Sequence, residues 1–440
     1  MKPQFLISSI GPGNGKTIFA MGLIHVLRKR GMKVQPYKCG PEITDTQLLT
    51  LSADNEAVNL DEWITTYTHI QHTYNKYGEK ADACIIEGNG ALFDGYKRMQ
   101  GSSAEIAKLL NVPVVLLVNA RMAGYSIASI IYGFKHFHPQ VKIVGVVFNQ
   151  ITSSAHYSYL KEACFDAGVD CLGYLPYNAE FKLPSKHSSI TLTTKRTMDT
   201  QINLIADDIE KNVNINRLLM NCNRNFPCQY TLPYSSDIEA ETVIPTSQQI
   251  KIAIARDTAF NFIYKENIAR LSIYGKISYF SPDYGSDLPE ADLIYLPGGY
   301  PELIARQLHR RHKLKNALKD YAEKGGKILA ECGGMAFLGR SITAKEGGTS
   351  YEMCNILPLD FTINSKLNSG YRKMIYNGVE LRGYEFHYSA TNNAENSLIA
   401  TQATNIKGTN VDLPLYRYKN IIASYGHWYW GDKDILDLWK

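Results

Sequence analysis

The sequence lacks the features that mark several specialised classes of protein. None of its apolar runs approaches the roughly eighteen consecutive residues that a membrane-spanning helix needs. Charge of one sign is not in large excess, because 47 Lys and Arg residues stand against 42 Asp and Glu residues. The N-terminus does not follow the charged, apolar and small-residue order of a secretion signal. We therefore expect neither a membrane nor a nucleic acid as a partner.

Cysteine is scarce as well, with eight residues scattered over a chain of 440. Cys222 and Cys228 are separated by a spacing that fits no zinc motif. This usage is typical of a reduced, cytoplasmic protein. At about 150 residues per domain the length predicts two to three domains. A hydrophobic content of 45% allows large cores that need neither disulfides nor metals.

The first half of the sequence alternates apolar strands with amphipathic helices. Near-continuous apolar strands are typical of a parallel sheet covered by helices on both faces, and the alternation predicts right-handed crossovers. We predict a doubly wound α/β domain over residues 1–221. Its expected strands are 4–9, 33–38, 83–87, 112–119 and 141–149, and its expected helices are 16–30, 102–110, 126–137, 156–167 and 200–221.

A second α/β pattern occupies the remainder of the sequence. Residues 222–249 are rich in Asn, Pro, Ser and Thr, which predicts an interdomain linker. We predict a second α/β domain over residues 250–440. Its expected strands are 251–255, 276–281, 292–297 and 327–330, and its expected helices are 260–272 and 301–324.

A glycine-rich segment, GPGNGKT at residues 11–17, joins the first expected strand to the first expected helix. Its glycines let the backbone approach a polyphosphate, to which the helix N-terminus offers free N–H groups. Ile10 stands where the usual phosphate-loop motif has its first glycine, and a glycine-rich turn with an accidental GKT is the alternative. The predicted ATP-binding residues are Gly13, Asn14, Gly15, Lys16 and Thr17.

Four carboxylates follow strand ends beside this loop: Glu42, Asp45, Glu87 and Asp94. Because open α/β sheets bind ligands at the carboxyl ends of their strands, we expect these side chains to converge there. A phosphate loop also needs a carboxylate that holds Mg²⁺. We predict a Mg²⁺ site formed by Thr17, Glu87 and Glu42, and catalytic roles for Asp45 and Asp94. The alternative for each carboxylate is that it caps its own loop.

Asn149 ends the expected strand 141–149 at the same edge of the sheet. A nucleotide whose phosphates lie on residues 13–17 would bring its base near this strand end. An amide side chain can donate to and accept from an adenine edge at once. We predict that Asn149 binds the base, and the alternative is that it caps the turn before Thr152.

A candidate nucleophile follows the expected strand 327–330. Cys332 precedes two glycines and an apolar helix, and a nucleophile on such a sharp turn is exposed at the top of a sheet. A helix N-terminus also lowers the pKa of a thiol. A buried structural cysteine is the alternative, and His387 and His427 are both candidates for the base. The predicted oxyanion-hole residues are Gly298, Gly299 and Gly333.

The motifs of the two halves form a combination that is more specific than any one of them. The first half contains GPGNGKT (11–17), KCGPEITD (38–45), IIEGNGALFDG (85–95) and GSSAEIAKLL (101–110). The second half contains ARDTAFNFIY (255–264), LPGGYPEL (296–303), AECGGMAFLG (330–339), GYEFHYS (383–389) and ASYGHWY (423–429). In this order they resemble the cobyrinate a,c-diamide synthase family, glutamine-dependent amidotransferases of corrinoid biosynthesis. The resemblance covers nearly the whole chain.

The resemblance implies a division of labour between the domains. It implies a dethiobiotin-synthetase-like N-terminal domain that uses ATP and Mg²⁺, and a class I glutaminase-like C-terminal domain. In the latter, Cys332 would be the nucleophile and His427 its base, with Tyr429 where other class I enzymes have an acid. His387 would then be structural or interfacial. The implied reaction is amidation of the a and c side-chain carboxylates of cobyrinic acid through an acyl phosphate, with glutamine, ATP and the corrinoid as small-molecule partners.

Three places depart from the family pattern and leave alternatives open. Residues 42–46 read EITDT where members read DYIDP, Asn119 replaces an Asp, and Tyr384 replaces a His. A Ni-sirohydrochlorin or hydrogenobyrinate a,c-diamide synthase is therefore an alternative, as is a chain that binds a tetrapyrrole without amidating it. A partition or regulatory ATPase is a further alternative, although Gly11 stands where its signature lysine would be. The resemblance also leaves a homodimer open.

Overall fold

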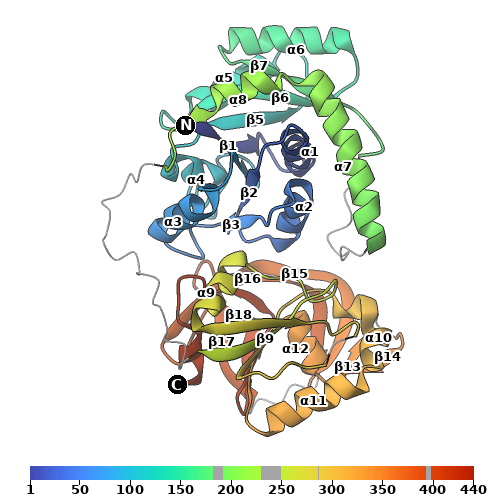
Figure 1. The fold of residues 1–440 in the computed structure, drawn as a ribbon. Coiled ribbons are helices and arrows are strands. Elements are labelled where there is room, and N and C mark those ends of the chain that lie inside the picture. The colour runs from blue at the N-terminus through green and yellow to red at the C-terminus, as the bar shows by residue number, and fades with distance from the viewer. Residues whose placement is uncertain (182–191, 229–248, 286, 346, 393–397) are drawn as a thin grey trace. The chain divides into compact units, whose positions relative to one another are not determined.

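In the computed structural model, the first half of the chain folds around a parallel sheet (Figure 1). The structure describes residues 1–181, 192–228, 249–285, 287–345, 347–392 and 398–440. These residues divide into an N-terminal and a C-terminal unit, which are described separately. Residues 229–248 of the predicted linker lie outside the described residues.

The N-terminal sheet has the strand order β3-β2-β4-β1-β5-β6-β7, with parallel neighbours throughout. Because β1 lies at its centre, the loop after β1 is placed between the ends of β4 and β5. The strands are β1 (Lys2–Ser9), β2 (Val34–Cys39), β3 (Val58–Leu60), β4 (Ala83–Glu87), β5 (Val114–Asn119), β6 (Ile143–Ile151) and β7 (Cys171–Pro176).

Helices cover both faces of this sheet, which confirms the predicted doubly wound α/β fold. On one face, helices α3 to α6 share a buried cluster with strand residues such as Leu6, Ile86 and Phe148. On the other face α1 packs against α2 and α7. The helices are α1 (Lys16–Lys29), α2 (Ile43–Ala53), α3 (Tyr67–Gly78), α4 (Ser103–Leu109), α5 (Ile127–His136), α6 (Ser154–Asp166), α7 (Leu192–Asn212) and α8 (Ile215–Asn221).

The end of the N-terminal unit differs from the prediction in two respects. The expected helix 200–221 is two helices, because the side chain of Asn214 accepts a hydrogen bond from the Arg217 amide and caps a new helix. The unit also extends beyond residue 221 into the predicted linker. Strand β8 (Asn223–Arg224) pairs antiparallel with β1, and Cys228 is buried in the same core.

The C-terminal unit has a mixed sheet. Strands β10, β9, β11, β12 and β19 are parallel neighbours in this order, and the sheet continues through β18, β17 and β15. Strand β16 pairs with β15 and with β20. The strands are β9 (Ile250–Ala255), β10 (Gly275–Phe280), β11 (Leu293–Leu296), β12 (Lys327–Glu331), β13 (Ser341–Thr343), β14 (Ser350–Glu352), β15 (Asp360–Tyr376), β16 (Val379–Asn392), β17 (Ile399–Asn405), β18 (Asn410–Tyr418), β19 (Ile421–Ser424) and β20 (Gly426–Tyr429).

The helices of this unit begin later or break more often than the sequence predicts. The expected helix 260–272 begins at Lys265, because the Asp257 carboxylate accepts the amides of Ala259 and Phe260 and holds a turn there. The expected helix 301–324 is three segments. The helices are α9 (Lys265–Tyr274), η2 (Pro301–Ile304), α10 (Ala305–His309), α11 (His312–Glu323), α12 (Gly333–Leu338) and η4 (Ile435–Trp439).

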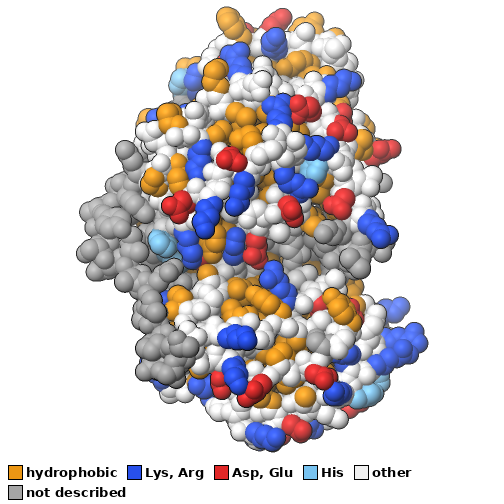
Figure 2. Space-filling view, viewed as in Figure 1, with side chains coloured by type: hydrophobic (Ala, Val, Ile, Leu, Met, Phe, Trp, Pro, Cys, Tyr) orange, Lys and Arg blue, Asp and Glu red, His pale blue; other side chains and the backbone are white. Residues whose placement is uncertain are grey.

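The surface of each unit carries charges of both signs. On the face shown in Figure 2, Lys and Arg side chains are interspersed with Asp and Glu side chains. No helix among the described residues has the length and apolar character needed to cross a membrane.

Candidate active sites

Asn14 holds the predicted phosphate loop in place at the centre of the N-terminal sheet. Its side-chain amide donates to the Gly11 carbonyl over 2.6 Å and accepts from the Asn119 amide over 2.9 Å. The backbone carbonyl of Asn14 accepts a hydrogen bond from Nδ2 of Asn149 over 2.8 Å. Gly15 adopts a left-handed φ of 90° directly before α1. The loop is thereby tied to the ends of β5 and β6, and the helix N-terminus opens into it.

Lys16 lies between this loop and the loop after β4. Its Nζ donates to the Gly90 carbonyl over 2.6 Å and to the Ser9 hydroxyl over 3.1 Å. Burial lowers the pKa of Lys16, and the nearby charge of Lys38 lowers it further. A second cation therefore lies close to the phosphate-loop lysine.

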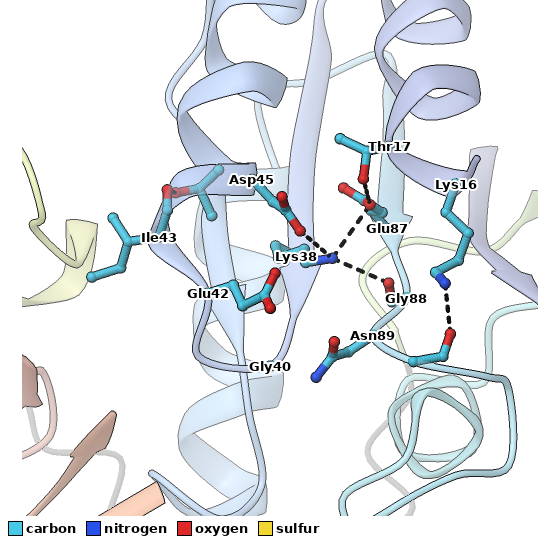
Figure 3. Close-up of polar contacts among 12 residues, drawn as sticks. Lys16, Thr17, Lys38, Gly40, Glu42, Ile43, Asp45, Glu87, Gly88 and Asn89 are labelled. Atoms are coloured by element: carbon cyan, nitrogen blue, oxygen red, sulfur yellow. Dashed lines mark hydrogen bonds and ion pairs between the residues drawn. The ribbon is translucent and has the colours of Figure 1, made fainter. Parts of the chain in front are cut away.

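Lys38 is the centre of the carboxylate cluster, as Figure 3 shows. Its Nζ lies 3.0 Å from Oδ2 of Asp45 and 3.3 Å from Oε1 of Glu87, and it donates to the Gly88 carbonyl over 3.2 Å. Burial opposes the charge of Lys38, but the carboxylates of Asp45, Glu87 and Glu42 together raise its pKa above the ordinary value. No pattern in the sequence predicts a role for Lys38, which directly precedes the CGPEITD segment.

Glu87 is the most deeply buried carboxylate of the cluster. Burial raises its pKa to about 7, against the opposing charge of Lys38. Oε1 accepts a hydrogen bond from the Thr17 hydroxyl over 2.5 Å, whereas Oε2 has no partner among the described residues. A buried carboxylate oxygen without a donor, next to a threonine hydroxyl, fits a Mg²⁺ ion bound through one carboxylate, waters and phosphate oxygens. No group of three or more acidic, His or Cys side chains in the described part of the chain could hold a metal alone.

The structure brings together three of the four predicted carboxylates. Glu42 and Asp45 lie at the start of α2 and face Lys38 together with Glu87. Asp94 is exposed on the loop after β4 and takes no part in the contacts described for this cluster. Asn149 is buried, and its Oδ1 accepts the Gln150 amide, so the side chain caps its own turn as well as the loop. Its role toward a base stays a prediction.

In the C-terminal unit, Cys332 occupies a strained turn between β12 and α12. Its φ of 43° and ψ of −105° are unusual for a residue with a side chain. The backbone amide donates to the Ser424 carbonyl over 2.7 Å and so fixes the turn to β19. Burial raises the pKa of the thiol and the Glu302 carboxylate raises it further, while the Gly333 amide opposes the shift. A strand-to-helix turn of this kind is where a nucleophile is expected, and the role of Cys332 stays a prediction.

His427 lies beside Cys332, from β20. A methyl group on Gly298 would lie 2.1 Å from Cε1 of His427 and 3.3 Å from Cβ of Cys332, so both side chains border the same point. Burial lowers the pKa of His427 to about 4, so the imidazole is neutral near pH 7. No side chain of the described residues hydrogen-bonds to either ring nitrogen. Tyr429 instead packs its ring against Tyr264, with centroids 5.5 Å apart.

A small pocket lies at this turn, and Cys332 is one of the residues that line it. Gly299 and Gly333 line it, whereas Gly298 lies against His427. Among the described residues, no backbone carbonyl accepts from the Gly299 amide, and its role in an oxyanion hole stays a prediction. His387, expected to be structural or interfacial, also lines this pocket.

Two protein families match the chain. The CobQ/CobB/MinD/ParA nucleotide binding domain matches residues 5–190, and the CobB/CobQ-like glutamine amidotransferase domain matches residues 251–435. The first match agrees with the nucleotide-binding fold and the second with the class I glutaminase-like fold.

Three similar proteins, each called cobyrinate a,c-diamide synthase, match along most of the chain. The protein from Dehalococcoides mccartyi strain ATCC BAA-2266 / KCTC 15142 / 195 is 35% identical, over 98% of this chain and 95% of its own length. The protein from Sulfurisphaera tokodaii is 33% identical over 97% of each chain. The protein from Listeria monocytogenes serotype 4b is 33% identical over 89% of this chain and 88% of its own. The chain therefore belongs to the cobyrinate a,c-diamide synthase family and is a glutamine-dependent amidotransferase that forms carbon–nitrogen bonds.

Proposed function

We propose that the chain uses ATP and glutamine to amidate the a and c side-chain carboxylates of cobyrinic acid. The observation that carries the proposal is that two separate sites of complementary chemistry lie on one chain. One is a phosphate loop beside buried cations, and the other is a thiol on a strained turn beside a neutral histidine. The names of the similar proteins support the substrate.

In the C-terminal unit, Cys332 attacks the side-chain amide carbon of glutamine after His427 accepts the thiol proton. The amides of Gly299 and Gly333 donate to the oxyanion that forms. His427 returns the proton to the departing nitrogen, and ammonia leaves. Water then hydrolyses the thioester, which releases glutamate and restores the thiol. Asp or Glu at residue 429 is not needed, because packing orients the imidazole.

In the N-terminal unit, the substrate carboxylate attacks the γ-phosphorus of ATP, which gives an acyl phosphate and ADP. Lys16 stabilises the charge on the transferring phosphoryl group, and Lys38 fixes Asp45 and Glu87 around the site. Thr17 and Glu87, with Glu42 nearby, would hold a Mg²⁺ ion that neutralises phosphate charge. Ammonia displaces phosphate from the acyl phosphate and leaves the amide. Asp45 and Asp94 are proposed as catalytic residues, although Asp94 lies exposed on its loop, and Asn149 is proposed to bind the base.

Residues 42–46, Asn119 and Tyr384 depart from the family pattern, and these departures bear on which macrocycle is bound. A Ni-sirohydrochlorin or hydrogenobyrinate substrate is the alternative. We further propose a cytoplasmic enzyme, since all eight cysteines are free thiols. A homodimer is also proposed, and light scattering of the purified chain tests it.

Mass spectrometry tests the reaction directly. The full chain is incubated with ATP, Mg²⁺, a nitrogen source and each candidate macrocycle. We expect two amides on cobyrinic acid with either glutamine or ammonium. Cys332→Ser should lose only the glutamine-dependent product, and Lys16→Ala should lose both. A chain that hydrolyses ATP but amidates none of the macrocycles would support the partition-type ATPase instead.

A further inference from the structure

Strand β20, which carries His427, is paired along one edge only. It lies antiparallel to β16, with His427 opposite Tyr384 and Trp428 opposite Gly383, and it pairs with no other strand in the described part of the chain. All four residues of β20 are buried. The backbone groups on its second edge therefore need partners other than a strand.

Two buried side chains supply these partners. The Trp428 amide donates to Oε1 of Glu331 over 3.2 Å, and the Trp428 carbonyl accepts from Nδ2 of Asn267 over 2.8 Å. Oδ1 of Asn267 also accepts from the Trp430 amide over 2.9 Å. Because Trp428 directly follows His427, these bonds fix the backbone next to the imidazole.

Glu331 links this backbone to the nucleophile. It is the last residue of β12 and directly precedes Cys332. One side chain therefore joins the residue before the thiol to the residue after the imidazole. The second oxygen of Glu331 is also held, since Oε2 accepts from the Tyr295 hydroxyl over 2.8 Å.

The fold does not need an acid at residue 331. Burial raises the pKa of Glu331 to about 8, against the hydrogen bonds from Tyr295 and Trp428. A buried carboxyl group costs free energy unless its oxygens are hydrogen-bonded, and an apolar side chain would fill the same space without that cost. Among the described residues that line the pocket at Cys332, Glu331 is absent. A role for Glu331 in the reaction would therefore act through the position of His427.

We propose that Glu331 is a positioning residue: by accepting the Trp428 amide it holds the backbone of His427 in place against Cys332, so that the imidazole can receive the thiol proton. Asn267 supports the same strand from α9. The proposal rests on the proposed glutaminase function of Cys332 and His427.

Steady-state release of ammonia from glutamine by the full chain tests this role. Glu331→Leu removes the acceptor and keeps a side chain of similar size. We expect kcat to fall about 10- to 100-fold with little change in KM, because a displaced base slows proton transfer while the pocket is unaltered. Glu331→Gln retains an oxygen for the Trp428 amide and an N–H group for the Tyr295 oxygen, so it should restore most of the lost kcat.

Leu318→Ala is the control for lost stability. Leu318 is buried in α11 of the same unit, so its truncation should lower the melting temperature and leave kcat at the wild-type value. All variants are assayed well below their melting temperatures. If Glu331→Leu does not fold, Asn267→Leu tests the same strand and should show the same fall in kcat with little change in KM.

Three results would overturn the inference. One is a wild-type kcat in folded Glu331→Leu or, in its place, Asn267→Leu. The second is a loss in Glu331→Gln as large as that in Glu331→Leu, and the third is an equal loss in Leu318→Ala. Glutamine hydrolysis that survives Cys332→Ser would instead overturn the glutaminase function.

Discussion

The imidazole of His427 lies directly against the backbone of Gly298. A methyl group at residue 298 would come within 2.1 Å of Cε1 and 2.6 Å of Nδ1 of His427, which is far inside van der Waals contact. The Phe262 ring contacts the imidazole with centroids 5.3 Å apart. This packing holds the His427 side chain in position.

Gly298→Ala should therefore displace the base without touching the phosphate loop. We expect glutamine-dependent amidation to fall about 100-fold or more, because small displacements of a general base are costly. Ammonium-dependent amidation should stay at the wild-type rate. Gly133→Ala in α5, where an added methyl group meets open space, is the matched control. Normal glutamine-dependent turnover in Gly298→Ala would contradict the assignment of His427.

Lys38→Met should abolish amidation with both nitrogen sources. The change leaves Glu87 and Asp45 without their shared cation. Removing one partner of a buried ion pair lowers the free energy of unfolding by about 3–5 kcal/mol. We expect a clear fall in the melting temperature of the full chain together with the loss of product. Lys108→Met removes a more exposed ion pair with Glu105 and should change neither the amidation nor the melting temperature. Undiminished amidation with ammonium would show that Lys38 is not part of the synthetase site.

Asn149→Ala distinguishes base recognition from loop support. If the amide binds adenine, KM for ATP should rise and the preference for ATP over GTP should narrow, with little change in kcat. If the side chain only supports the phosphate loop through its hydrogen bond to the Asn14 carbonyl, KM should rise equally for both nucleotides. Steady-state kinetics with ATP and GTP give the ratio, and an unchanged ratio leaves Asn149 as a support of the loop.

His427 should make the stability of the chain sensitive to acid. Its pKa is about 4 when folded and 6.5 ordinarily, so between these values the unfolded chain binds more protons and stability falls as the pH falls. Through this one group, the free energy of unfolding should fall by about 2 kcal/mol between pH 7 and pH 5. Unfolding of the full chain at both pH values should show a smaller difference in His427→Gln than in the wild type. The exposed His136→Gln is the control, and identical pH responses of His427→Gln and wild type would refute the prediction.

Much of the N-terminal fold follows from local sequence. Continuous apolar strands, a glycine-rich turn and an amphipathic helix specify β1, the phosphate loop and α1, because each signal acts within a few residues. The strained turn at Cys332 is likewise specified locally by the glycines that follow it. The resemblance of whole motifs was needed to choose His427 over His387, since both follow apolar strand residues.

Only the tertiary structure revealed how charges and side chains from distant segments meet. Lys38 became the centre of the carboxylate cluster because β2 and β4 are hydrogen-bonded neighbours, which places Lys38 beside Glu87. The pairing of β15 with β16 places Arg372 against Glu385, whose other carboxylate oxygen lies 2.8 Å from Nε2 of His387. Strand order and register decide such contacts, and they depend on long-range packing that no local pattern in the sequence contains.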